Sequence, residues 1–237
     1  MPSSFFQFKQ FSVYHDRCAM KVGTDGVLLG AWCDVSQAKT ALDIGTGTGL
    51  IGLMMAQRNA DIITDAIDID ISAIKQAKGN IVQSPFASRI KCHHISLQSF
   101  KEHCLAKYDI IVSNPPFFVQ SLKSPDKNRT LARHTDSLQM EELIGIASGL
   151  LSDRGKLSVI YPYEYKDSLI RLASNSGLYI SRITNVYPTP SSLPKRVLIE
   201  FSKTELLLTE NDLIIEKARH IYSDEFTALV KDFYLKL

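Results

Sequence analysis

The sequence lacks the features of a membrane-spanning or secreted protein. No run of about eighteen apolar residues, the length that a membrane-spanning helix needs, occurs in its 237 residues. Residues 1–10 lack the basic start and apolar core of a secretory signal, so we expect a cytoplasmic location. No CxxC pair occurs either, which indicates reduced thiols at the four cysteines, Cys18, Cys33, Cys92 and Cys104.

Metal-ligand spacing and an excess of charge of one sign are also absent. His93 and His94 are adjacent and point to opposite sides of a strand, so we expect a structural or surface role for them and no metal site. The net charge is only +2, so any surface for a nucleic acid must come from local clustering of basic residues. With 45% apolar and 22% charged residues, the chain is typical of a globular protein, and we expect one domain over residues 1–237 and a monomer.

The order of predicted elements indicates an α/β fold. Residues 5–14 are rich in aromatic side chains and predict a short strand or hairpin within an N-terminal cap segment, residues 1–38. A core over residues 39–237 then alternates strands and helices, which is typical of a mostly parallel sheet with helices on both faces. The last two strands are joined by a turn rich in proline and serine, so we expect them to be antiparallel. The predicted strands are 40–44, 63–68, 89–95, 108–113, 156–161, 178–186 and 197–203, and the predicted helices are 24–32, 50–57, 71–82, 140–151, 163–175 and 224–235.

A glycine-rich turn follows the first strand of this core. In the segment ALDIGTGTGLIG, Gly45, Gly47 and Gly49 allow a sharp turn and a close approach of the backbone to a ligand. Asp68 ends the next strand, where a carboxylate can bind ribose hydroxyls. Because ligands of such sheets lie beyond the carboxyl ends of the strands, the turn predicts a nucleotide-like cofactor there.

Two cofactors compete for this turn. The spacing of Gly47, Gly49 and Gly52 matches a dinucleotide fingerprint, as in an oxidoreductase. Asp43, however, precedes the first glycine, and its carboxylate would repel a pyrophosphate but suits the ammonium group of S-adenosylmethionine. We therefore favour an S-adenosylmethionine site, and we expect Asp43 to contribute to it.

The segment NPPF directly after the strand 108–113 carries the predicted chemistry. An aromatic amino nitrogen is a poor nucleophile, and two oxygens that accept its hydrogens can aim its lone pair at a methyl donor. The side chain of Asn114 and the carbonyl of Pro115 can supply these oxygens, and Phe117 offers a ring for stacking an extruded base. We interpret Asn114, Pro115 and Phe117 as catalytic, with Asn114 also beside the cofactor.

Together, DIGTGTG, the acid of AIDID and NPPF resemble the class I amino-methyltransferases. The segments QFSVYHDRCAMKVGTDGVLLGAW (10–32) and ARHTDSL (132–138) are similar to those of the bacterial valine-tRNA adenine N6-methyltransferases. This resemblance implies a Rossmann-like, seven-stranded sheet with a reversed last strand, S-adenosylmethionine as donor and the adenine beside the anticodon as acceptor. Many relatives have an acid that binds the cofactor's adenine where this chain has Ser96, so we expect Ser96 or the backbone of Leu97 to take that role.

A basic loop is the predicted tRNA contact, because the catalytic core leaves no separate recognition domain. Loop 121–134 contains one acid, Asp126, against Lys123, Lys127, Arg129, Arg133 and His134. Such residues suit phosphate contacts, and the surface can be extended by Lys9, Arg17, Lys21, Lys195 and Arg196. Other acceptors stay open: a protein glutamine side chain, whose amide needs the same two oxygens, and DNA adenine, for which duplex recognition normally needs an added domain. A non-catalytic RNA-binding module would not require Asn114.

Overall fold

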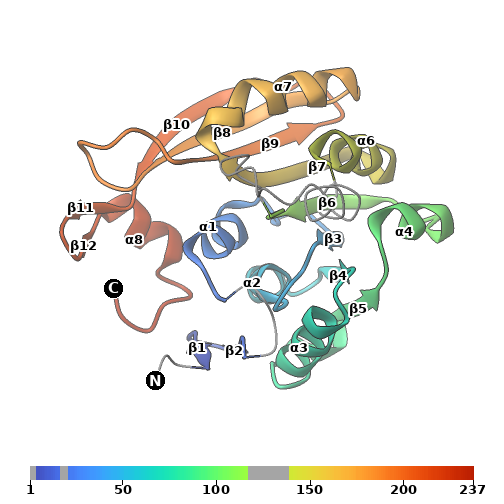
Figure 1. The fold of residues 1–237 in the computed structure, drawn as a ribbon, viewed down its shortest axis with the longest axis horizontal. Coiled ribbons are helices and arrows are strands. Elements are labelled where there is room, and N and C mark those ends of the chain that lie inside the picture. The colour runs from blue at the N-terminus through green and yellow to red at the C-terminus, as the bar shows by residue number, and fades with distance from the viewer. Residues whose placement is uncertain (1–3, 17–20, 117–138) are drawn as a thin grey trace, which may run out of the picture.

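A large central sheet organises the computed structural model, which describes residues 4–16, 21–116 and 139–237. Its strands are β3 (Thr40–Ile44), β4 (Ile63–Asp68), β5 (Ile90–His94), β6 (Tyr108–Ser113), β7 (Leu151–Pro162), β8 (Tyr179–Tyr187), β9 (Arg196–Ser202) and β10 (Thr209–Ile214). They pair in the order β10-β8-β9-β7-β6-β3-β4-β5 (Figure 1). Strand β9 runs antiparallel to β7 and β8, and every other pair in the sheet is parallel.

Helices cover both faces of this sheet because its strands are apolar on both sides. In β6, Ile110 and Val112 join one core cluster and Ile111 joins the other. The first cluster is covered by α1 (Thr24–Trp32), α2 (Leu50–Arg58), α3 (Ile71–Val82) and α8 (Asp224–Val230). The second is covered by α4 (Leu97–His103), α6 (Met140–Leu150) and α7 (Lys166–Asn175), which Figure 1 shows on the opposite side of the sheet. Short 3-10 helices cover Ala87–Arg89 and Tyr163–Tyr165.

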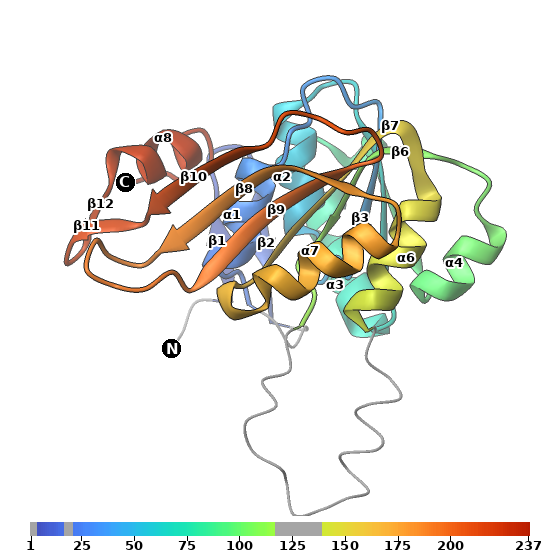
Figure 2. The ribbon, with the colours of Figure 1, turned by 90° about the horizontal axis from the view of Figure 1, so that it is seen from above.

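The predicted α/β architecture is confirmed, with one strand more in the sheet than the resemblance implied. The antiparallel pair β8–β9 is confirmed, and β9 is the reversed strand. The eighth strand, β10, lies at the edge, parallel to β8 (Figure 2). Its residues 209–212 are exposed and only Leu213 is buried, so TENDLI carries no apolar alternation from which a strand could be predicted.

The N-terminal segment forms the predicted hairpin from β1 (Phe5–Gln7) and β2 (Ser12–Tyr14). It packs against the C-terminal end of the chain, where Lys9 N donates to Phe233 O at 2.8 Å. Phe8 and Phe11 are buried in the core, whereas Phe5 and Phe6 are exposed. At the other end of the chain, β11 (Glu216–Ala218) and β12 (Ile221–Tyr222) form a second small hairpin that was not predicted. None of the helices in the described part of the chain is both long and apolar enough to cross a membrane.

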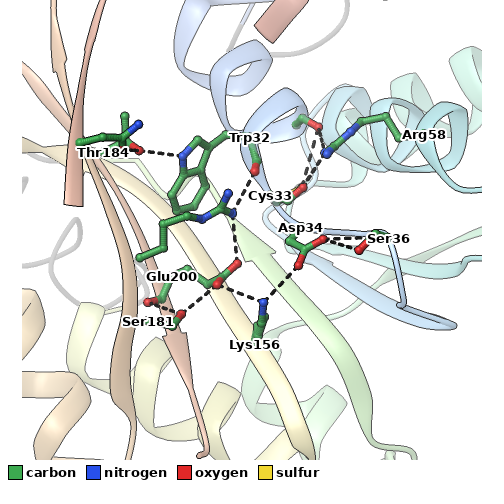
Figure 3. A network of polar contacts seen from close by, with 12 residues as sticks. Trp32, Cys33, Asp34, Ser36, Arg58, Lys156, Ser181, Thr184 and Glu200 are labelled. Carbon is green, nitrogen blue, oxygen red and sulfur yellow. Dashed lines mark hydrogen bonds and ion pairs between the residues drawn. The ribbon is translucent and has the colours of Figure 1, made fainter. Parts of the chain in front are cut away.

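A buried polar network anchors the C-terminal end of α1 to the sheet (Figure 3). The indole Nε1 of Trp32 donates to Thr184 Oγ1 at 2.8 Å, and the guanidinium of Arg182 lies 3.8 Å from the centre of the Trp32 ring. Arg182 and Lys156 both pair with Glu200, at 3.1 and 3.3 Å, and the Glu200 side chain is only 3% exposed. Helix α1 also borders Asn114 at Gly26, near its start. The network therefore fixes the other end of a helix that forms one wall of the candidate site.

We expect Glu200→Gln to lower the free energy of unfolding by about 3 kcal/mol, because it leaves two cations facing a buried site without their shared carboxylate. Urea denaturation at neutral pH measures the change. The matched control is Glu210→Gln, since Glu210 is an exposed partner of Lys166 and its loss should cost less than about 1 kcal/mol. Equal stability of Glu200→Gln and the wild-type protein would contradict this account of the network.

Candidate functional site

The candidate site lies at the carboxyl ends of β3, β4 and β6, where a parallel sheet binds its ligands. The glycine turn follows β3 at Gly45, and Asn114 follows β6. These two neighbouring strand ends are fastened together by Ser113 Oγ, which donates to Ile44 O at 2.9 Å. The structure therefore brings the predicted cofactor turn and the predicted acceptor segment side by side.

The three glycines of the turn all have positive φ, at +70° for Gly45, +56° for Gly47 and +81° for Gly49. A Cβ added to Gly45 or Gly47 would find no atom within 4 Å, whereas at Gly49 it would lie 3.3 Å from Ala77 Cβ of α3. Gly45 and Gly47 thus border open space that a ligand could enter. Gly49 instead allows α3 to pack closely against the turn, because it has no side chain.

Asp68 lies beside the turn at the end of β4 and is half-buried. Its Oδ2 accepts from Gly47 N at 2.9 Å, and its Oδ1 accepts from Asp70 N at 2.9 Å. The carboxylate therefore helps to shape the glycine turn while part of it stays accessible. A carboxylate in this place could accept hydrogen bonds from ribose hydroxyls, as the sequence predicts.

Ser96 lies close to Asp68 along the same edge of the sheet, because Ile95 N donates to Asp68 O at 3.1 Å. The Ser96 hydroxyl caps α4 by accepting from Ser99 N at 3.1 Å. Among the described residues this hydroxyl accepts a bond from Ser99 N, and its hydrogen could be donated to a ligand. The structure thus explains a serine at this position by helix capping, and its contact with a cofactor stays a prediction.

Asp43 lies beneath the turn and not at its surface. It is fully buried, and its Oδ2 accepts from Thr46 Oγ1 at 2.7 Å. Its Oδ1 is also buried and has no partner among the described residues. Burial raises the pKa of Asp43 from 3.8 to about 6, against the opposing effect of hydrogen bonds from Thr46 and the Gly52 N–H. Asp43 therefore holds the turn from below, and its charge can act on a cationic ligand only through the turn.

We expect Asp43 to make stability fall as the pH rises. An acid with a higher pKa in the folded state binds more protons there than in the unfolded chain. Raising the pH from 3.8 to about 6 therefore favours unfolding. Relative to Asp43→Asn, the wild-type protein should lose about 3 kcal/mol of stability between roughly pH 4 and pH 7. Urea unfolding of both proteins across this range measures the difference.

Asp109→Asn provides a control of opposite sign for that measurement. Burial raises the pKa of Asp109, but hydrogen bonds from the N–H groups of Lys39 and Thr40 outweigh it and leave the pKa below its usual value. Relative to Asp109→Asn, the wild-type protein should therefore gain stability as the pH rises through the acidic range. If the Asp43 difference has the same sign as the Asp109 difference, the described environment of Asp43 is wrong.

Asn114 brings a buried hydrogen-bond acceptor to the site. Its Oδ1 is buried and unpartnered among the described residues, while Pro115 is buried and Pro116 is exposed. Such an oxygen is costly unless something donates to it, so it points to a ligand with N–H groups. Helix α1 borders it at Gly26, where an added Cβ would lie 3.0 Å from Leu50 Cδ2 and 3.9 Å from Asn114 Nδ2.

Several predicted residues lie elsewhere or outside the described part of the chain. Phe117, Arg17 and the basic loop 121–134 belong to residues that the structure does not describe. Arg196 is held by Asp25 at the start of α1, with Nε donating at 2.8 Å. Lys9 contacts the C-terminal segment of the chain, where its Nζ donates to Lys231 O at 2.6 Å. His93 pairs with Asp65 at 2.7 Å, in agreement with the structural role predicted for it.

Sequence reasoning missed three residues that shape the site. Gly26 admits α1 next to Asn114, Thr46 binds Asp43, and Asn80 of α3 binds the backbone of the turn. Nothing in the spacing of Gly26 or Thr46 indicates these contacts. Asn80 carries a faint signal, because it is a polar residue next to Ile81 on the apolar face of α3 and is only 1% exposed.

Comparisons with known proteins agree with this geometry. Residues 19–166 match the family model described as "Methyltransferase small domain". Among solved structures, the chain is similar to a predicted O-methyltransferase from Agrobacterium tumefaciens, with a TM-score of 0.69 and 20% identity over 88% of this chain and 96% of that one. A ribosomal protein L11 methylase from Lactobacillus delbrueckii subsp. bulgaricus has a TM-score of 0.58 and 15% identity over 81% and 84% of the two chains. The fold and the family model together define a class I methyltransferase.

Full-length relatives give the family within this class. The chain is 51% identical to a tRNA1(Val) (adenine(37)-N6)-methyltransferase of Parabacteroides distasonis and 52% identical to one of Phocaeicola vulgatus, over the whole of each chain. A relative with the same description from Trichodesmium erythraeum is 50% identical, again over both whole chains. The chain belongs to the family of tRNA1(Val) (adenine(37)-N6)-methyltransferases, as its resemblance predicted.

Proposed function

We propose that this protein transfers a methyl group from S-adenosylmethionine to the N6 nitrogen of adenine 37 in valine tRNA. The observation that carries the proposal is the buried, unpartnered Oδ1 of Asn114 beside the open glycine turn. An acceptor oxygen at this place suits a substrate that presents N–H hydrogens, such as an adenine amino group. The full-length relatives support the choice of this nucleotide, since they are described as acting on it.

The residues at the carboxyl ends of β3 and β4 fit the cofactor. The backbone at Gly45 and Gly47 borders space free of protein atoms, and half-buried Asp68 lies beside it for the ribose hydroxyls. Asp43 places a carboxylate beneath the turn, where its charge favours a cationic ligand over a pyrophosphate. S-adenosylmethionine, when bound, supplies a methyl group activated by a positively charged sulfur.

Asn114 and Pro115 act on the acceptor nitrogen. The Oδ1 of Asn114 and the carbonyl oxygen of Pro115 accept the two hydrogens of the adenine amino group, which draws its lone pair out of conjugation with the ring. Pro115 is the second residue after β6, and its ring fixes φ and so helps to hold the direction of its carbonyl. Once the nitrogen has gained the methyl group it must lose one proton, and because neither oxygen is basic enough to keep it, that proton passes to solvent. Both residues therefore contribute by positioning and hydrogen bonding.

The remaining parts of the proposal concern the tRNA. Phe117 would stack on the extruded adenine, and the basic loop 121–134 would contact phosphates, as its composition predicts. An anticodon loop suits this arrangement, because its bases are already partly unstacked and cost little to extrude. A tRNA substrate also accords with action in the cytoplasm and with a single chain that carries its own basic loop.

The test is methyl transfer from labelled S-adenosylmethionine to total tRNA, duplex DNA and cell protein, followed by nucleoside mass spectrometry. We expect N6-methyladenosine in tRNA alone, and in valine tRNA with an unmodified position 37 above all other species. Label on glutamine in protein would move the substrate to the alternative that uses the same two oxygens. Label in DNA would make the enzyme a DNA adenine methyltransferase, and cofactor binding without any transfer would contradict the proposed chemistry.

A further inference from the structure

Asn80 of α3 is a buried side chain whose hydrogen bonds go to two separate segments of the chain. Its Oδ1 accepts from Tyr14 N at 2.9 Å, and its Nδ2 donates to Tyr14 O at 2.9 Å, as a neighbouring strand would. The same Nδ2 donates to Thr48 O at 2.9 Å. With 1% of its surface exposed, Asn80 is shielded from most of the water that could replace these bonds if they are lost.

The two segments that Asn80 joins have different relations to the site. Thr48 lies between Gly47 and Gly49, so its carbonyl belongs to the glycine turn itself. Tyr14 is the last residue of β2 in the N-terminal hairpin, from which the chain leads on to α1 and the wall beside Asn114. One amide therefore holds the cofactor turn and the N-terminal hairpin against the same point of α3.

The turn needs such a support because three of its five residues, 45–49, are glycines. Gly45, Gly47 and Gly49 all adopt positive φ, and glycine loses more freedom than any other residue when its backbone is fixed. A bond to the carbonyl of Thr48 from a rigid helix restricts the turn to the conformation in which Gly45 and Gly47 face the open space. A turn held in this way is prepared for its ligand before the ligand arrives.

We propose that Asn80 is a positioning residue of the methyl-transfer site, which fixes the cofactor turn through Thr48 and couples it to the N-terminal hairpin through Tyr14. This inference rests on the proposed function in one respect, namely that S-adenosylmethionine is the ligand of the turn. Because coupling between two parts of a protein is reciprocal, cofactor binding also tightens the attachment of the hairpin. Asn80 touches neither the reacting atoms nor the acceptor residues Asn114 and Pro115 in this assignment.

Asn59 offers a matched control within the same chain. Its Nδ2 donates to Val35 O at 2.6 Å and Ala38 O at 2.8 Å, and its Oδ1 accepts from Asp61 N at 2.9 Å. Its side chain thus makes three bonds to backbone groups, as that of Asn80 does, and ties the end of α2 to the distant segment 35–38. It follows the carboxyl end of α2, however, at the opposite end of the sheet from the glycine turn.

The experiment compares Asn80→Ala with Asn59→Ala in cofactor binding by calorimetry, tRNA methylation and thermal unfolding. Both variants should lose stability, and Asn80→Ala should lose more because Asn80 is buried whereas Asn59 is only half-buried. Only Asn80→Ala should weaken S-adenosylmethionine binding, by about tenfold, as expected for the loss of a buried hydrogen bond that holds the turn. Its KM for the cofactor should rise while kcat at saturating cofactor stays close to wild type. Equal cofactor affinity of Asn80→Ala and the wild-type protein would overturn the proposal.

A second measurement needs no variant and applies even if Asn80→Ala fails to fold. In the wild-type protein, S-adenosylmethionine should slow hydrogen exchange at the Tyr14 amide, which donates to Asn80, and leave the Asp61 amide, which donates to Asn59, unchanged. Unchanged exchange at Tyr14 on cofactor binding would overturn the coupling. Failure of the wild-type protein to bind S-adenosylmethionine at all would instead contradict the proposed function, so the two failures are distinguishable.

Discussion

Replacing Asn114 with alanine should reduce methyl transfer to tRNA by about a hundred- to a thousandfold, the usual cost of removing one transition-state hydrogen-bond partner. The side-chain oxygen lies buried at the end of β6 without a partner among the described residues, so we expect its hydrogen bond to be made with the substrate. The loss should appear in kcat, because the bond strengthens as the amino nitrogen leaves conjugation. Single-turnover methylation of valine tRNA with saturating cofactor measures it.

Stability and a second substitution separate this role from simple packing. Since the Asn114 oxygen accepts no hydrogen bond from the described residues, Asn114→Ala should change the free energy of unfolding by no more than about 1 kcal/mol. Asn114→Asp keeps an acceptor oxygen in the same place and should retain clearly more activity than Asn114→Ala. If the two variants are equally inactive, or if Asn114→Ala keeps more than about a tenth of the activity, hydrogen-bond acceptance by Asn114 is not what drives the reaction.

The architecture was predictable wherever apolar periodicity was strong. Strand β6, with Ile110, Ile111 and Val112 alternating between two buried faces, could be read directly from its sequence. Elements with little buried surface could not. Strand β10 buries only Leu213, and the short helix α4 buries only Leu97 and Phe100, so neither has enough apolar residues to form a pattern. Their places depend on pairing with β8 and packing on α6, which are long-range contacts.

The candidate site was predictable in its residues more than in their roles. The glycines and Asn114 follow strand ends, and the topology brings neighbouring strand ends together, so their proximity follows from the order of elements. Asp43 shows the limit of this reasoning. The sequence pattern indicates a carboxylate near an ammonium group, but the alternation along β3 turns it towards α2, where it accepts from Thr46 beneath the turn. Whether a strand-end residue faces the ligand or supports the loop depends on side-chain direction and packing, which the motif does not contain.

The basic residues illustrate the same limit at the surface. Lys195 and Arg196 stand together in the sequence and suggest a phosphate contact, but Arg196 is paired with Asp25 across the start of α1. This ion pair joins β9 to the helix that borders Asn114 at Gly26. A residue counted as an RNA contact from its charge therefore also fixes a wall of the site. Charge alone cannot distinguish these uses, because the partner lies 171 residues away in the sequence.

Gly45→Ala should weaken cofactor binding strongly while lowering stability by no more than about 1–2 kcal/mol. The added methyl group meets no protein atom within 4 Å, so it would project into the open space beside the turn that we assign to S-adenosylmethionine. The backbone, at φ +70°, would also be strained, by about 1–2 kcal/mol for a residue with a Cβ. Calorimetric titration with S-adenosylmethionine should show affinity weakened by at least about a hundredfold, since the clash with ligand adds to the strain.

Gly177→Ala separates the clash from the strain. Gly177 follows α7, has φ +72°, is exposed like Gly45, and likewise has no atom within 4 Å of an added Cβ. The two substitutions therefore cause similar backbone strain, and neither added methyl group touches a protein atom. They differ only in whether the cofactor occupies the space next to the methyl group. Both variants should unfold at similarly lowered temperatures, and Gly177→Ala should bind S-adenosylmethionine as the wild-type protein does. Equal binding by both variants would place the cofactor away from Gly45, whereas weakened binding in Gly45→Ala alone would locate it at the turn.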